Sequence, residues 1–201
     1  MIKDLQAQAD YIKNNFAEAN VVEPISYDNL IIYVAADKIV SFLKFLHDDS
    51  NLSFKCFIDL FGADMLGVRS PRFEVIYNLL SLKLNNRITI KVAIEDGEEV
   101  PTATQVFSGA GWFEREAFDM YGIIFSGNTD LRRILTDYDF EGYPLRKDFP
   151  LTGYKEVRYD EEQQKVVYEP VKLMQEFRSF DFEMPWEGAK KAFLSDNKNK
   201  S

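Results

Sequence analysis

Three carboxylates on one predicted helix are the residues of this sequence best suited to acid–base chemistry. Glu114, Glu116 and Asp119 lie within two helical turns, and Arg115 lies between them in the sequence. Two carboxylates act as general acid and general base when their surroundings separate their pKa values. No other catalytic group accompanies these three, so ion pairing, within the chain or across an interface, explains the cluster better.

A second group of carboxylates imitates a calcium-binding loop. Asp137, Asp139 and Glu141 are followed by Gly142, and Asp148 takes the twelfth position. This acidic spacing and the glycine fit an EF-hand. The Glu at position five, the short Asp at position twelve and two nearby prolines do not. A solvated or partner-facing turn is the better interpretation, and the sequence leaves open whether Asp137, Asp139 and Glu141 bind any ion.

The scarcity of cysteine and histidine excludes most metal and nucleophile chemistry. Cys56 and His47 are the only residues of their kinds. A structural zinc ion needs four such ligands, and iron–sulfur clusters are normally held by four thiolates. A single cysteine also rules out an intrachain disulfide. The formal net charge of -9 makes electrostatic binding to nucleic acid or to an anionic membrane unfavourable.

The sequence shows no targeting or membrane segment. No apolar run approaches the ~18 residues that a membrane span needs. The first residues lack the apolar stretch of a signal peptide, and Asp4 and Asp10 argue against an acid-poor transit peptide. We therefore expect a chain that folds in the compartment where it is made.

Residues 1–125 are predicted to form the domain that positions the carboxylate cluster, because their apolar residues recur with the periods of helices and strands. Apolar residues at spacings of three and four predict helices over 2–16, from about 37 to 46, and from about 104 to 121. Runs and alternations of apolar residues predict strands at 30–34, 54–60, 73–80 and 87–94. Asn85 and Asn86 suggest a hairpin between the last two. The expected fold class is α+β, with a mainly antiparallel sheet of about four strands and helices packed on it.

Residues 126–187 lose this periodicity but remain rich in aromatic side chains. Four of the seven prolines fall between residues 141 and 187 and interrupt any long helix. Ten aromatic residues lie from Phe140 to Trp186, whereas a disordered linker is poor in them. We expect residues 126–187 to be an extended arm that wraps a partner and buries its rings there. Residues 188–201, polar and rich in lysine, are expected to be a flexible tail.

Two motifs mix arginine and aspartate with apolar residues. They are Asp-Leu-Arg-Arg-Ile-Leu-Thr-Asp at 130–137 and Pro-Leu-Arg-Lys-Asp-Phe-Pro at 144–150. Guanidinium and carboxylate groups suit bidentate contacts, and next to an aromatic arm a buried protein contact is favoured over an ordinary surface. The predicted partner-contact residues are Glu114, Arg115, Glu116, Asp119, Asp130, Arg132, Arg133, Asp137, Arg146, Asp148, Arg158 and Arg178.

Taken together, these segments resemble one family. Residues 112–123, 130–137, 142–150, 153–160, 169–171 and 175–182 are similar to the C subunit family of NADH-quinone oxidoreductase, the 30-kDa subunit of respiratory complex I. The family usually has His-Pro where this chain has Asn128-Thr129, and commonly has Gly at Asp139 and His at Tyr143. These departures remove histidines and leave the arginine–aspartate pattern intact.

The resemblance implies a role in a redox-driven proton pump that passes electrons from NADH to a quinone. It implies a scaffold protein of the peripheral arm with no catalytic residue and no cofactor of its own. FMN and the iron–sulfur clusters would belong to other subunits. The implied partners are chiefly the 49-kDa-type (D) subunit, at the quinone site, and the cluster-bearing subunits B and I. The implied location is the cytoplasmic side of the bacterial inner membrane, or the matrix side in mitochondria, without a membrane span.

Two other functions stay open at this point. One is the equivalent subunit of a related membrane-bound hydrogenase, or of a dehydrogenase fed by ferredoxin or a coenzyme. The other is a free-standing acid–base enzyme that uses Glu114, Glu116 and Asp119. The hypothesis of a free-standing enzyme predicts a soluble monomer that has its own activity and a pH profile set by a carboxylate.

Overall fold

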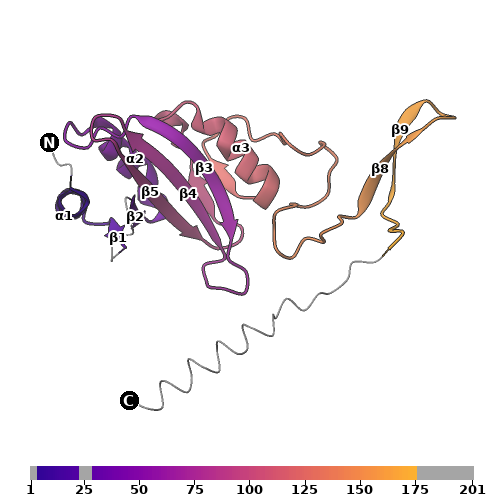
Figure 1. Ribbon diagram of the computed structural model, residues 1–201, viewed down its shortest axis with the longest axis horizontal. Helices are drawn as coiled ribbons and strands as arrows, with labels where there is room; N and C mark the ends of the chain where they lie inside the picture. Colours follow the sequence, from indigo (N-terminus) through magenta and orange to yellow (C-terminus); the bar gives the residue numbers. More distant parts are fainter. Residues whose placement is uncertain (1–3, 23–28, 176–201) are drawn as a thin grey trace, which may run out of the picture. The chain divides into compact units, whose positions relative to one another are not determined.

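The computed structural model describes residues 4–22 and 29–175. The chain divides into two compact units, Met1–Gly153 and Tyr154–Ser201. Figure 1 shows the helices and strands of the first unit. Its helical elements are α1 (Leu5–Asn15), the 3-10 turn η1 (Ala36–Lys38), α2 (Ile39–Asp48), the 3-10 turn η2 (Ala103–Gln105) and α3 (Ala110–Tyr121).

The first unit is built around one sheet with the strand order β1-β2-β5-β4-β3. These strands are β1 (Asn20–Val21), β2 (Asn29–Tyr33), β3 (Cys56–Asp64), β4 (Phe73–Ser81) and β5 (Asn86–Ile94). Strands β2 and β5 are parallel, and the other neighbours are antiparallel. A separate parallel pair joins β6 (Glu99–Pro101) to β7 (Ile124–Ser126). The α+β class and the mainly antiparallel sheet are confirmed.

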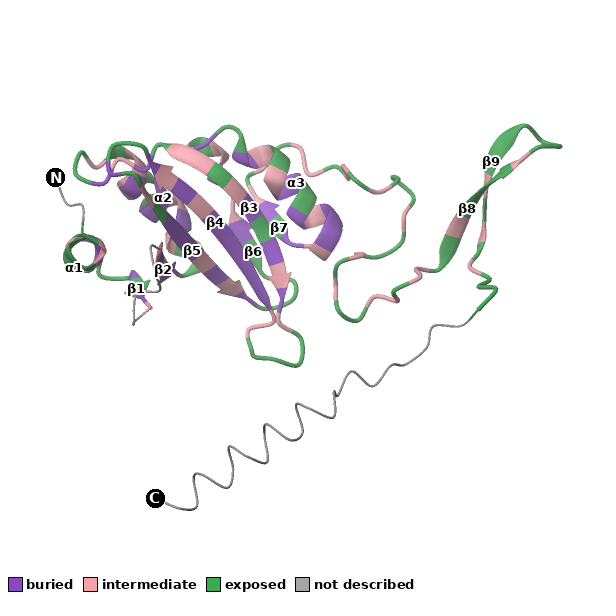
Figure 2. Ribbon diagram, in the orientation of Figure 1, coloured by how far each residue is buried: buried purple, intermediate pink, exposed green. Residues whose placement is uncertain are grey.

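One face of the sheet forms the core of the first unit. Tyr77 on β4 lies opposite Ile90 on β5 and Leu60 on β3, and all three are buried. Ile12 of α1 and Phe42 of α2 belong to the same buried cluster. Figure 2 shows this burial as purple bands along the long strands. The alternation of apolar residues in the sequence is therefore the alternation of the core face.

The opposite face of the sheet carries a hydrogen-bonded polar ladder. The Asn29 side-chain amide donates to the Thr89 hydroxyl at 2.8 Å, and that hydroxyl donates to Asn78 Oδ1 at 2.7 Å. The Asn78 amide then donates to Asp59 Oδ1 at 2.8 Å. The four residues come from β2, β5, β4 and β3, so the ladder helps to fix the register across the sheet.

A bulge changes the side-chain pattern predicted for β3. The register shifts between Phe57 and Asp59, which leaves Ile58 as an extra residue and 36% exposed. Phe57 turns inward and packs against the rings of Phe107 and Phe113, at centroid distances of 5.3 and 5.6 Å. The simple alternation expected over 54–60 is therefore wrong before Leu60.

Helix α3 begins later than predicted and ends where predicted. Residues from Thr104 were expected to be helical, but the Thr102 hydroxyl accepts the N–H of Thr104 and caps a single 3-10 turn instead. The helix ends before Gly122, whose φ is 76°. A Cβ on Gly122 would lie 2.6 Å from the ring of Tyr143, so this position needs glycine for close approach as well.

Residues 126–153 fold back onto the first unit, although they are largely irregular in backbone conformation. The boundary predicted at residue 125 thus falls inside a compact unit that extends to Gly153. Residues 126–153 belong to this unit because buried carboxylates and guanidinium groups bind them to α3 and to the sheet.

The second unit contains a hairpin in its described part. Strand β8 (Lys155–Asp160) pairs antiparallel with β9 (Lys165–Pro170), and neither has a buried residue, as Figure 2 shows. Residues 176–187 of the predicted arm, with Arg178, and the predicted tail at 188–201 lie outside the described residues.

This division predicts where trypsin first cuts the free chain. Among the tryptic sites from Arg132 to Arg158, we expect those after Lys155 and Arg158 to be cut first, because their peptides lie outside the first unit. The guanidinium groups of Arg133 and Arg146 are bound within the first unit and do not reach the specificity pocket of the protease without local unfolding. Mass spectrometry of a time course identifies the products. A first cut after Arg133 would contradict the division and restore a boundary near residue 125.

Candidate functional site

Helix α3 carries three of the predicted contact residues on its buried side. Glu114 and Asp119 are fully buried, and Arg115 is 8% exposed. Their polar groups meet residues that flank α3 in the sequence rather than open solvent. Buried charges require such partners, because removing an ionised group from water is costly when it stays unpaired.

The Glu114 carboxylate joins the turn before α3 to the turn after β7. Its Oε1 accepts the backbone N–H of Ala103 at 2.7 Å. Its Oε2 accepts the Thr102 hydroxyl and the Asn128 side-chain amide, both at 2.7 Å. Since these donors come from both sides of the helix, Glu114 fixes the chain where it approaches α3 and where it returns.

The Asp119 carboxylate holds three consecutive backbone groups. Its Oδ2 accepts the N–H groups of Ile134, Leu135 and Thr136 at 3.0, 2.7 and 2.9 Å. Its Oδ1 accepts the Thr136 hydroxyl at 2.5 Å and Arg133 Nη1 at 2.8 Å. Burial alone would raise the pKa of Asp119, but the hydrogen bonds from Thr136 and from the three N–H groups outweigh burial and hold the pKa well below its usual value.

Arg115 supplies the complementary donors on the same helix. Its Nε and Nη2 donate to the carbonyl oxygens of Arg132 and Arg133, both at 3.0 Å. Its guanidinium carbon lies 5.2 Å from the centre of the Trp112 ring, within cation–π distance. Arg115 and Asp119 together therefore bind both kinds of backbone group of residues 132–136.

Arg133 continues the contact toward the following turn. Besides its bond to Asp119, it donates from Nη2 to the Gly142 carbonyl at 3.0 Å. The guanidinium lies 5.7 Å from the Phe140 ring centre and 5.4 Å from that of Tyr143. Stacking between rings favours Arg over Lys at this position.

Arg146 attaches the next turn to the end of α3 and to the sheet. Its Nε donates to the Tyr121 carbonyl at 2.7 Å, and its two terminal nitrogens each bind an Asp96 oxygen at 2.9 Å. The guanidinium lies between the rings of Phe73 and Tyr143, at 5.0 and 4.8 Å. Such a bidentate contact fixes orientation as well as distance.

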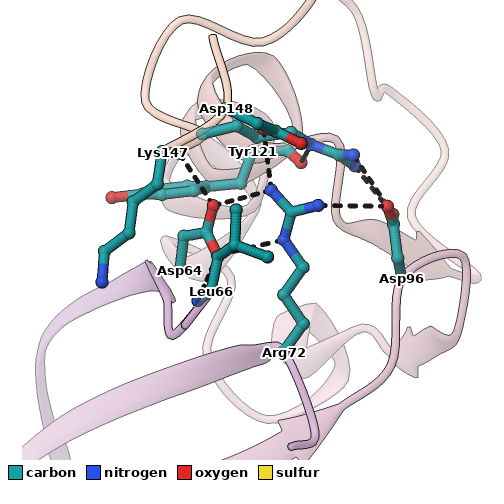
Figure 3. Close-up of polar contacts among 8 residues, drawn as sticks. Asp64, Leu66, Arg72, Asp96, Tyr121, Lys147 and Asp148 are labelled. Atoms are coloured by element: carbon teal, nitrogen blue, oxygen red, sulfur yellow. Dashed lines mark hydrogen bonds and ion pairs between the residues drawn. The ribbon is translucent and has the colours of Figure 1, made fainter. Parts of the chain in front are cut away.

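Arg72 and Asp64 form a second ion-pair centre at the hairpin loop between β3 and β4. Figure 3 shows the Arg72 guanidinium bound to both Asp64 oxygens at 3.0 and 2.9 Å, and to Asp148 at 2.8 Å. Asp64 also accepts the N–H groups of Leu66 and Lys147, at 2.9 and 2.8 Å. The hydrogen bonds from Arg72 are the main reason why the pKa values of Asp64 and Asp148 lie below their usual range.

We call these groups the carboxylate–guanidinium clamp. Its members are Asp64, Asp96, Glu114, Asp119 and Asp148 with Arg72, Arg115, Arg133 and Arg146. The sequence singled out six of these as contact residues and missed Arg72, Asp64 and Asp96. Opposite charges at the two ends of the β3–β4 hairpin loop were the available signal for Arg72 and Asp64.

Other predicted contact residues lie outside the clamp. Glu116 and Asp137 are exposed. Arg132 binds Asp130 through Nε and Nη2 at 2.6 and 2.9 Å, and its side chain is 64% exposed. In the second unit, Arg158 pairs with Glu169 and Asp160 at 3.3 and 3.5 Å. Contact of these residues with a partner stays a prediction.

This arrangement serves attachment rather than acid–base chemistry. The oxygens of Glu114 and Asp119 are occupied by structural donors, and Glu116 lies on the exposed side of the helix. Within residues 4–22 and 29–175, no three Asp, Glu, His or Cys side chains form a group that could hold a metal ion. In the same ranges, no helix has the length and apolarity needed to cross a bilayer.

Comparison with known proteins gives consistent matches. Residues 32–155 match the family model described as respiratory-chain NADH dehydrogenase, 30 Kd subunit. The chain is 52% identical over 201 residues, all of both chains, to the NADH-quinone oxidoreductase C subunit of Sinorhizobium medicae. It is 59% identical over 159 residues, 79% of each chain, to the same subunit of Paramagnetospirillum magneticum.

A solved structure with a similar fold is among the matches. It is titled Nqo5 of the trypsin-resistant fragment (1-134) in P63 form, and it matches with a TM-score of 0.51 at 22% identity. The match covers 63% of this chain and the whole of that fragment.

Replacing Asp119→Asn tests the clamp at one of its two fully buried carboxylates. The Asn side chain has no charge to pair with Arg133. Its NH2 group is a donor, and it would replace one of the carboxylate oxygens that accept hydrogen bonds. We expect the free energy of unfolding of the full chain to fall by about 3–5 kcal/mol. Urea denaturation followed by circular dichroism measures the change. Glu116→Gln, an exposed carboxylate on the same helix, is the matched control and should change stability by less than about 0.5 kcal/mol. Equal effects of the two variants would contradict the assignment.

The clamp also predicts how stability depends on pH. Asp64 and Asp119 have lower pKa values in the folded chain than the ~3.9 of an unfolded Asp. Their contribution is therefore complete above that unfolded value and is lost as the pH falls toward the folded pKa values. We expect the free energy of unfolding to decrease from pH 5 to pH 2. Urea titrations of Asp64→Asn should show a lower stability at pH 7 and a shallower decrease in acid. If the stability of Asp64→Asn decreased with pH as steeply as that of the wild type, Asp64 would not contribute to the acid sensitivity.

Proposed function

The chain belongs to the 30-kDa subunit family of respiratory-chain NADH dehydrogenase, and we propose that it serves this enzyme as a scaffold without catalytic residues or a cofactor of its own. In this role it holds other subunits of the peripheral arm in position while electrons pass from NADH to a quinone. The observation that carries the proposal is the exposed apolar face of the β8–β9 hairpin.

The cross-strand register sorts the hairpin side chains by chemistry. Val157 lies opposite Tyr168, and Tyr159 lies opposite Val166, so all four share one face. Each of these side chains is between 52% and 59% exposed. The other face places Arg158 near Glu169 and Asp160, at 3.3 and 3.5 Å. The hairpin thus has one apolar face and one ion-paired face.

An isolated two-stranded hairpin is at best marginally stable in water. Complete burial of one Val side chain against a partner contributes about 1.5–3 kcal/mol, and Tyr adds a large ring with a polar end that suits interfaces. A partner that covers the apolar face therefore stabilises the hairpin and gains affinity from the same side chains. This is the behaviour expected of a segment that folds against another subunit.

The proposal extends to the partners and the location of the chain. We assign the hairpin and the residues after it chiefly to the 49-kDa-type (D) subunit, and the remaining contacts to the cluster-bearing subunits B and I. FMN and the iron–sulfur clusters reside in partner subunits under this proposal. The scaffold would lie on the cytoplasmic side of the bacterial inner membrane, and it would bind no nucleic acid, in keeping with its net charge of -9.

Two neighbouring valines test the hairpin face. Val166→Asp places a charge on the apolar face, whereas Val167→Asp makes the same change on the face of Arg158. With Val166→Asp we expect at least about a tenfold loss of assembled complex, because a buried unpaired charge opposes docking. Native gels of solubilised membranes measure the amount of assembled complex, and an assay of NADH:quinone reductase measures its activity. Both should fall together in Val166→Asp. Val167→Asp should leave both near the wild-type level.

The scaffold proposal has a clear contrary outcome. If Val166→Asp assembles normally but turnover is lost, the chain takes part in catalysis and is not a scaffold. If both variants assemble and turn over normally, the hairpin face does not bind another subunit.

A further inference from the structure

Three large side chains in the first unit are exposed near the start of α3 and in the segment that follows β7. Trp112 is 64% exposed, Leu135 is 63% exposed and Tyr138 is 76% exposed. An exposed Trp is unusual, because the indole ring is among the largest apolar groups and is highly buried on average. Arg132 lies close enough to Tyr138 for the two groups to interact electrostatically. We call Trp112, Arg132, Leu135 and Tyr138 the aromatic patch.

The patch is held rigidly from beneath by the clamp. The guanidinium of Arg115, itself 8% exposed, lies 5.2 Å from the Trp112 ring centre and donates to the Arg132 carbonyl at 3.0 Å. Asp119 accepts the N–H of Leu135 at 2.7 Å. Arg115 thus contacts both the Trp112 ring and the backbone of Arg132, and Asp119 on the same helix holds the N–H groups of residues 134–136. A partner that binds here loses little entropy in ordering these groups.

We infer that the aromatic patch is a docking site for another protein subunit, which receives the Trp112 indole in an apolar pocket. The inference rests on the proposed role of the chain as a subunit, and it adds a contact separate from the hairpin. Trp, Tyr and Arg are the residues that most often dominate binding energy at protein interfaces. In the described part of the chain, no acceptor binds the Trp112 indole N–H, so the pocket supplies one.

The charges around the patch identify the chemistry of this partner. Arg132 is neutralised by its two bonds to Asp130, at 2.6 and 2.9 Å. The exposed ionised groups next to the patch in sequence or on the helix are acidic, namely Glu116, Asp137 and Asp139. An acidic border repels anionic lipid head groups and nucleic acid phosphates. It attracts a protein surface with basic residues around an apolar pocket.

Hydroxyl-radical footprinting of the wild-type chain tests this site without any mutation. Oxidation of Trp112 and Tyr138 is measured by mass spectrometry in the free full-length chain and in the purified complex. We expect both residues to be oxidised at least tenfold more slowly in the complex. Leu82, 78% exposed in the β4–β5 turn, is the control and should be oxidised equally in both.

Each other outcome has a defined meaning. Equal oxidation of Trp112 in the free chain and in the complex would overturn the inference, while presence of the chain in that complex would still support the proposed function. Absence of the chain from the complex would instead contradict the proposed function. Protection of Trp112 by phosphatidylglycerol vesicles, or by raising the concentration of the free chain, would assign the patch to a lipid surface or to a second copy and overturn the inference.

A variant series measures the contribution of the indole to binding. Trp112→Ala should weaken association with the complex by about 30-fold, the effect of a strong interface anchor. Trp112→Phe keeps an apolar ring without the N–H and should lie between Ala and wild type. Leu82→Ala is the matched control and should bind like the wild type. The Trp112 ring is exposed in the free chain. The melting temperature of the free chain should therefore shift by less than about 3 °C in every variant. Normal binding by Trp112→Ala would overturn the inference.

Discussion

A segment without helix or sheet can lie against a protein only if its backbone polar groups find partners there. Residues 126–149 satisfy this constraint with side chains. Asp119 accepts three consecutive N–H groups, and Arg115 binds two consecutive carbonyl groups next to them. Because each buried charge also has an opposite charge or several hydrogen bonds, the clamp avoids the cost of burying an ion alone. The path of the segment is then determined by α3 and the sheet.

The fold was predictable where one face of an element is buried and the other is not. Alternation over 73–80 and 87–94 correctly predicted strands, whose Tyr77 and Ile90 lie in the core, and the helix predicted to end at about residue 121 does end there. Prediction failed where one residue changes the local geometry. The bulge at Ile58 reverses the pattern of its strand, and the hydroxyl of Thr102 replaces the first turns of the expected helix. Neither event alters composition or period enough to be seen in a single sequence.

The candidate site was predictable in its residue types but not in the partners of those residues. The arginine–aspartate motifs singled out Arg133 and Arg146, and the carboxylate cluster of the predicted helix singled out Asp119; all three proved to be paired. Sequence spacing says that charges of opposite sign are available, but not whether the partner lies in the same chain. Asp96 meets Arg146 across 50 positions of sequence, and only the fold brings such residues together. The sequence favoured a buried contact with another protein for these motifs, whereas the partners that the structure shows for Arg133 and Arg146 lie in the same chain.

The pairing within the chain limits what another subunit can bind. If a partner were to take Arg133 for itself, the buried charge of Asp119 would lose its counter-ion. If a partner were to take Arg146, Asp96 would keep only its longer ion pair with Arg72, at 3.8 Å. Binding that leaves the clamp intact avoids this cost. The aromatic patch on one unit and the tyrosine and valine face of the hairpin on the other are exposed and remain for a partner. Charge therefore fixes the path of residues 126–149 in the first unit, and under the proposals made above exposed rings supply the affinity for other subunits.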